Sequence, residues 1–113
     1  MRFAPSRVMQ IQIRHDDTIN GRAQVQSEIR ALVTDALARF VAHITTIEVH
    51  VADENHQKRG GDDIRCSIEV RWGGRHPTAV THHAADLYVA VDAAAAKMAR
   101  RLDHELGRIR VGE

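Results

Sequence analysis

The stretch DLYVAVDAAAAKMARRLDHELGRIR, residues Asp86 to Arg110, decides how the rest of the chain must fold. Its apolar residues recur at steps of three and four, which is the spacing of a helix with one buried side. These residues are Leu87, Val91, Ala95, Met98, Leu102, Leu106 and Ile109. The spacing predicts a helix over 86–110 that packs on a core made by the residues before it.

The same helix carries basic residues on the side away from this apolar seam. Helical geometry places them within an arc of roughly 100°. They are Lys97, Arg100, Arg101, His104 and Arg108, which we call the cationic ridge. Asp103 and Glu105 lie to either side of the ridge, so the pattern predicts a basic surface that faces solvent.

Two further kinds of pattern occur before this helix. Apolar residues at helical spacing over 22–41 predict a first helix with a nearly neutral outer surface. Alternation of apolar and polar residues predicts half-buried strands. The predicted strands cover 8–14, 45–52, 64–72 and 75–83.

The turn between the last two strands has its own signature. Gly73 and Gly74 can both take the positive φ that a tight hairpin needs. Pro77 cannot donate a ladder hydrogen bond, so it places the fourth strand at a sheet edge or delays its start.

The element order predicts an α+β fold of the form βαβββα. A strand, helix, strand sequence favours two parallel strands, and the shorter connections favour antiparallel neighbours. Each helix has one apolar side, so both should cover one face of a four-stranded mixed sheet. We expect a single domain over 1–113, with a loose lead-in over 1–7 and an exposed connection over 53–63.

The whole-chain numbers limit the class of protein. The chain has 113 residues, a formal net charge of +1 and one cysteine. A chain-wide basic character is therefore absent, and any contact with nucleic acid must come from local patterning. A single cysteine fits a reducing compartment, and there is no apolar run long enough for a membrane span. We expect a cytoplasmic protein that does not contact a membrane.

The residues do not favour catalysis, a cofactor or a metal. His82 and His83 are adjacent on a predicted strand and point to opposite faces, which is poor for shared coordination. Cys66 and Trp72 fall on the predicted core face. Since phosphate loops, serine elbows and Cys-His pairs are lacking, we expect a protein that is not an enzyme.

The chain resembles the ribosome hibernation-promoting factor and ribosome-associated inhibitor family over about residues 8–110. The resemblance rests on the βαβββα order, the glycine hairpin, and the spacing D-x-Y-x-A-x-D-x(4)-K-x-A-R-x-L. That spacing runs through Asp86, Tyr88, Ala90, Asp92, Lys97, Ala99, Arg100 and Leu102. Because long forms of the family carry a further C-terminal dimerisation domain, a chain ending at Glu113 resembles a short form.

The resemblance implies binding to the small ribosomal subunit and its RNA, and the promotion of ribosome hibernation under stress. It implies that RNA is contacted by Lys97, Arg100, Arg101, Arg108, Arg110 and Tyr88, and we add His104 as a member of the cationic ridge. The departures from the family are a first helix without lysines, and Asp103 and Glu105 where basic residues are usual.

Two other interpretations stay open. Tyr88 can instead pack on the helix with its hydroxyl at the rim. The protein can also be an interaction module that forms a homo-oligomer through its exposed sheet face or the edge of its fourth strand, with weak or no RNA binding.

Overall fold

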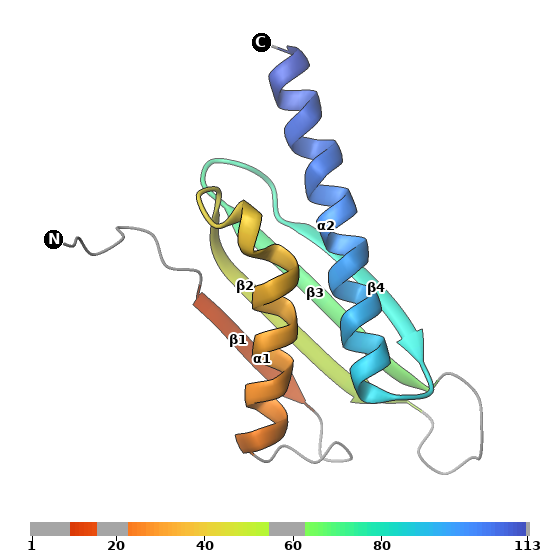
Figure 1. The fold of residues 1–113 in the computed structure, drawn as a ribbon. Coiled ribbons are helices and arrows are strands. Elements are labelled where there is room, and N and C mark those ends of the chain that lie inside the picture. Colours follow the sequence, from red (N-terminus) through yellow and green to blue (C-terminus); the bar gives the residue numbers. More distant parts are fainter. Residues whose placement is uncertain (1–9, 16–22, 55–62, 113) are drawn as a thin grey trace, which may run out of the picture.

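The computed structural model describes residues 10–15, 23–54 and 63–112, with side chains as far as residue 107. Its elements follow the predicted order βαβββα (Figure 1). The strands are β1 (Gln10–His15), β2 (Ile44–Asp53), β3 (Ile64–Trp72) and β4 (Thr78–Ala84). The helices are α1 (Ala23–Leu37), the short 3-10 helix η1 (Ala38–Phe40) and α2 (Leu87–Gly112).

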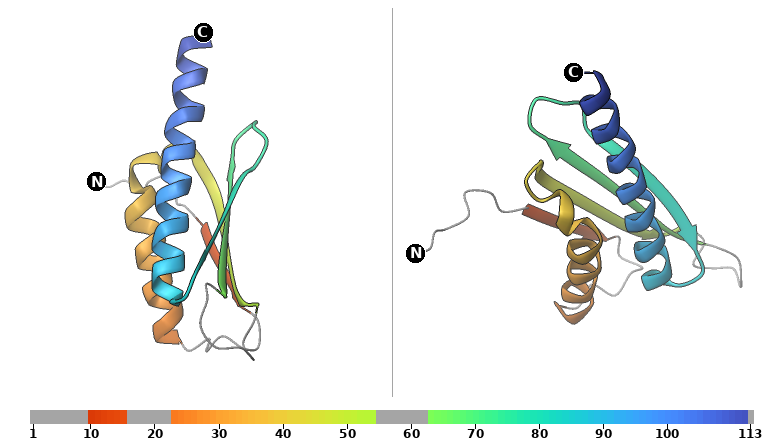
Figure 2. Two further views of the ribbon diagram at one scale, coloured as in Figure 1. Left: turned by 90° about the vertical axis from the view of Figure 1, so that its right-hand side faces the viewer. Right: turned by 45° about the horizontal axis from the view of Figure 1, so that its top comes forward.

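The four strands form one mixed sheet in the order β1-β2-β3-β4. Strands β1 and β2 are parallel, with Ile11 opposite Ile47, whereas β2–β3 and β3–β4 are antiparallel. Both helices cover the same face of the sheet, as the side view in Figure 2 shows. The predicted fold class, strand pairing and placement of the helices are therefore confirmed.

The core lies between that face of the sheet and the two helices. Alternate residues of β2 and β3 point into it and are fully buried, including Val49, Cys66 and Ile68. From α2, Met98 and Leu102 fill the same layer with no exposed surface. The apolar seam of α2 is thus the inner side of the helix, as its spacing predicts.

Some element boundaries differ from the predictions. The first helix was expected over 22–41, but α1 ends at Leu37 and the chain tightens into η1. Strand β4 begins at Thr78, directly after Pro77, which has no N–H to donate to a ladder. Three parts of the predicted chain lie outside the described residues. They are the lead-in, residues 8 and 9 of the first strand, and most of the connections around 16–22 and 55–62.

Helix α2 is longer than the sheet that it covers. Its last turns extend past the sheet end in Figure 1, beyond the hairpin that joins β3 to β4. Within the part of the chain that the structure describes, no helix is long and apolar enough to cross a membrane.

Candidate nucleic-acid interface

Helix α2 begins at a side-chain cap. The Asp86 carboxylate accepts a hydrogen bond from the backbone N–H of Val89 at 3.0 Å, which satisfies one of the free amides of the first turn. The first helical hydrogen bond runs from the N–H of Ala90 to the carbonyl of Asp86 at 2.9 Å. Asp86 thus caps the N-terminus of α2 and fixes the residue at which the helix begins.

The predicted ridge lies on the flank of α2 that faces β4. Lys97 is half-buried, and its Nζ donates to the backbone carbonyl of Thr81 on β4 at 2.8 Å. The expectation of a ridge pointing wholly into solvent is therefore wrong at this position. Helical geometry places Lys97 away from the apolar seam, but β4 lies close enough to α2 for the long Lys97 side chain to contact its backbone.

The next three ridge residues are more open. Arg100 and His104 are exposed, and no hydrogen bond or ion pair of Arg100 is formed with the residues described. Arg101 is also exposed and lies 3.7 Å from the Glu105 carboxylate one turn later. An exposed pair of this kind is weak, so the guanidinium of Arg101 is available to another anion.

Arg101 and Glu105 also form one wall of a pocket of about 560 Å³. The opposite wall is the β3–β4 hairpin, namely Trp72 and residues 74–78. Arg75 lies in this wall with its guanidinium carbon 5.7 Å from the centre of the Trp72 ring. We call this space the hairpin pocket. It brings together basic residues from two elements that are separated in sequence.

The other flank of α2 faces α1 and has different chemistry. The Tyr88 hydroxyl donates to the Glu28 carboxylate at 2.6 Å, and this bond raises the pKa of Tyr88 above its ordinary value. Higher on the same flank, Arg39 forms an ion pair with Asp103. Tyr88 therefore bridges the two helices, and it lies on the opposite flank of α2 from Arg101.

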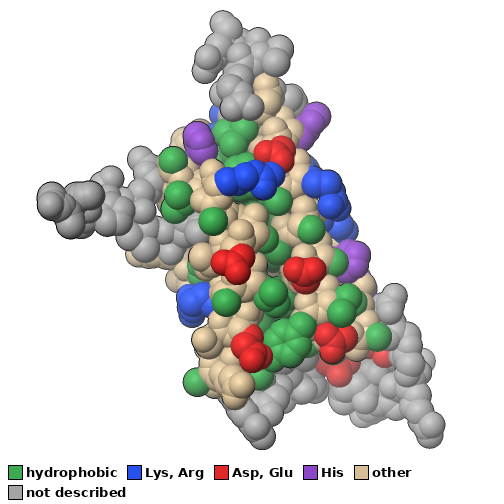
Figure 3. Space-filling model, viewed as in Figure 1, with side chains coloured by type: hydrophobic (Ala, Val, Ile, Leu, Met, Phe, Trp, Pro, Cys, Tyr) green, Lys and Arg blue, Asp and Glu red, His purple; other side chains and the backbone are tan. Residues whose placement is uncertain are grey.

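Charge divides the helical face into two parts. Acidic side chains predominate over its lower half, whereas basic ones lie toward the top and at both sides, with an acidic group beside those at the top, as Figure 3 shows. The exposed acids of the lower half are Glu28 and Asp35 on α1, Asp86 just before α2 and Asp92 within it, whereas Asp103 is exposed farther along α2 beside Arg39. A polyanion would be repelled by the acidic half, so the basic half is the candidate interface.

The last ridge residue, Arg108, and the predicted RNA contact Arg110 lie late in α2. Arg108 and Arg110 fall within the helix as predicted, but their side chains lie outside those described. The sequence interpretation placed Glu105 beside the ridge, but it did not assign Arg75 or Arg39 to the charged surface. Arg75 follows directly after the glycine hairpin, which is the one local signal that could have singled it out.

The described residues offer neither a nucleophile nor a metal site. Burial raises the pKa of the Cys66 thiol to about 12, so the thiol stays neutral at physiological pH. His82 and His83 alternate between the inner and outer faces of β4. Among the residues described, no group of three or more His, Cys, Asp or Glu could hold a metal ion.

A family profile matches the chain. The family is described as sigma 54 modulation protein / S30EA ribosomal protein, and the match covers residues 18–110. The chain belongs to this family. The S30EA family is a group of ribosome-associated, non-enzymatic translation modulators that includes the hibernation factors. The resemblance noted in the sequence is thereby confirmed.

Solved structures share the fold of this S30EA protein. The N-terminal domain of Protein Y from Thermus thermophilus matches with a TM-score of 0.67 at 18% identity, covering 85% of this chain and 98% of that one. A ribosomal subunit interface protein from Coxiella burnetii matches with a TM-score of 0.65 at 17% identity, covering 88% and 99%. No curated protein sequence matches the chain.

Proposed function

We propose that this S30EA protein binds the RNA of the small ribosomal subunit through the β4-facing flank of α2 and promotes ribosome hibernation under stress in the cytoplasm. The observation that carries the proposal is the exposed basic surface of Arg100, Arg101 and His104 on a rigid helix. Membership of a ribosome-associated family supports the choice of partner.

The physics of RNA binding fits this surface. Affinity for RNA comes largely from cations that displace counterions from phosphates, and A-form RNA is contacted mainly through its backbone and shape. Arginine suits the task because its planar guanidinium can engage phosphate oxygens at two points. Leu102 anchors this part of α2 in the core, so the helix backbone that carries these cations is fixed to the sheet.

The basic surface is small for such a partner. Lys97 donates a hydrogen bond to the Thr81 carbonyl, and Arg39 forms an ion pair with Asp103. The neighbouring face carries Glu28, Asp35 and Asp92. We therefore expect a one-sided contact that depends strongly on salt and on a few arginines.

Co-sedimentation with ribosomes tests the proposal. Arg100→Glu combined with Arg101→Glu should release the protein from small subunits while its circular dichroism spectrum stays unchanged. The matched control is Arg14→Glu, because Arg14 is exposed on the far face of β1. Undiminished binding of the double variant, or equal loss in the Arg14 variant, would contradict the assignment of the interface.

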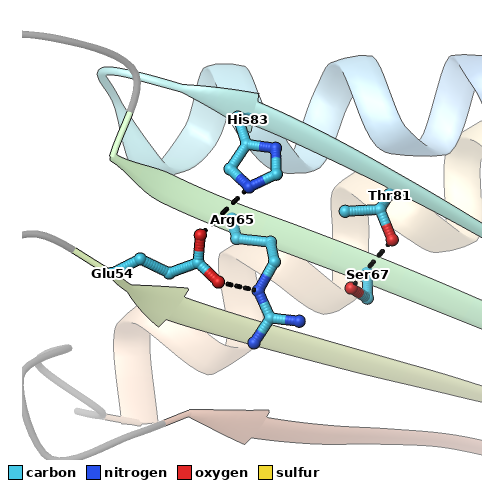
Figure 4. Close-up of polar contacts among 5 residues, drawn as sticks. All are labelled: Glu54, Arg65, Ser67, Thr81 and His83. Carbon is cyan, nitrogen blue, oxygen red and sulfur yellow. Dashed lines mark hydrogen bonds and ion pairs between the residues drawn. The ribbon is translucent and has the colours of Figure 1, made fainter.

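The alternative function is a homodimerisation module that uses the outer face of the sheet or the β4 edge. The outer face is polar and internally paired, as Figure 4 shows: Glu54 contacts Arg65 at 2.8 Å and His83 at 3.1 Å, and Ser67 bonds Thr81 at 3.1 Å. Stable homodimer interfaces are more apolar than this. Analytical ultracentrifugation tests the alternative, since it predicts a dimer with no ribosome binding.

A further inference from the structure

The hairpin pocket is built by the way β3 passes into β4. Strand β3 ends at Trp72, the chain turns at Gly74 with φ of 73°, and β4 starts only at Thr78. The connection therefore bows away from the sheet, and α2 runs past it with Arg101 and Glu105 facing the gap. The resulting volume of about 560 Å³ is within the size range of small-ligand sites.

The wall of the pocket is held in place by the indole of Trp72. Its Nε1 donates to the backbone carbonyl of His76 at 3.3 Å, and the ring is only 4% exposed. The Trp72 ring is thus a fixed support and is too buried to stack on a ligand itself. The Arg75 guanidinium rests near this ring, a cation–π arrangement that orients it while leaving its N–H groups for an acceptor.

The charges in the pocket select the kind of ligand. Arg75 and Arg101 supply two cations, and the loose contact of Arg101 with Glu105 at 3.7 Å leaves both groups open to a further partner. Two arginines suit a phosphate group. The Glu105 carboxylate can only accept hydrogen bonds when ionised, so it repels a second anion and favours an amino group.

We propose that the hairpin pocket binds an unpaired nucleotide of single-stranded RNA, with its phosphate on Arg75 and Arg101 and a base amino group, such as N4 of cytosine, on Glu105. Carboxylates are the usual acceptors for that amino group. An acidic peptide would satisfy the arginines but would meet repulsion from Glu105. The proposal rests on the proposed function and extends it, because Arg101 belongs to both surfaces.

Trp72 gives a direct readout, since it is the only tryptophan in the chain. We expect short oligocytidylate to change the Trp72 emission of the full chain and to bind more tightly than oligouridylate. Arg75→Gln should weaken oligocytidylate binding about tenfold, which is the effect of losing one charge-assisted hydrogen bond. The slope of log affinity against log salt concentration should become less negative by about 0.7. Glu105→Gln should reduce the preference for cytosine over uracil.

The control is Arg14→Gln, which makes the same change of charge on the far side of the sheet. Equal loss in the Arg14 and Arg75 variants would overturn the pocket assignment, as would unchanged Trp72 emission. Equal affinity for the oligonucleotide and for an oligoaspartate peptide would also overturn it.

Ribosome co-sedimentation separates the two proposals. If the unmodified chain sediments with ribosomes and Arg75→Gln sediments equally well, the pocket proposal fails and the proposed function stands. If the unmodified chain does not sediment with ribosomes, the proposed function fails whatever the oligonucleotides show.

Discussion

Replacing Leu102 with alanine tests whether the apolar seam of α2 lies in the core. Leu102 has no exposed surface and lies one residue after Arg101. Removing its buried methyl groups should cost about 3 kcal/mol, within the range for leucine to alanine changes in cores. For 113 residues the entropy of unfolding is about 240 cal/mol/K, so the melting temperature should fall by about 12 °C.

Urea unfolding followed by circular dichroism measures this loss. The matched control is Leu106→Ala one turn later, where the side chain is only partly buried, so a smaller loss is expected. Below its melting temperature the Leu102 variant should still bind ribosomes, since the arginines remain in place. A loss of less than about 1 kcal/mol at Leu102, or a larger loss at Leu106, would refute the placement of the seam.

Three further predictions concern residues whose environments are already defined. Lys97→Met should remove the hydrogen bond to β4 and lower the free energy of unfolding by about 1 kcal/mol, measured by urea titration. It should also leave more of this edge strand open to self-association, measured by light scattering. Equal stability of the variant and the unmodified chain would show that the contact is unimportant. Cys66 should resist alkylation in the folded state at pH 8, and folding should weaken as pH rises from 9 toward 12, because the unfolded thiol ionises first; rapid labelling of native protein would contradict this. Tyr88, the only tyrosine, should titrate above pH 10 in absorbance, and Glu28→Gln should lower its pKa toward the ordinary value.

The sequence predicted those features that depend on local periodicity. The alternation over 64–72 has one geometrical meaning, a strand with one buried face, and β3 occupies that range. Pro77 marked the late start of β4 for a similar reason, since it lacks an N–H. The seam through Met98 and Leu102 likewise follows from helical spacing alone.

The surface could be predicted only in part, because partners from other elements decide where long side chains go. A helical projection cannot show that Lys97 meets the Thr81 carbonyl or that Arg39 meets Asp103. The hairpin pocket joins Arg75 to Arg101 across the chain, and no local pattern connects the two. The division into acidic and basic halves likewise appears only once α1 and α2 are placed side by side.

The most direct test of the central claim is the sedimentation of the unmodified chain with small ribosomal subunits over a range of salt concentrations. Binding through about three basic side chains in contact with phosphate predicts association at low salt and a log–log slope of about −2 to −3. Absence of binding at low salt, or binding that salt does not weaken, would contradict recognition of RNA by the basic flank of α2.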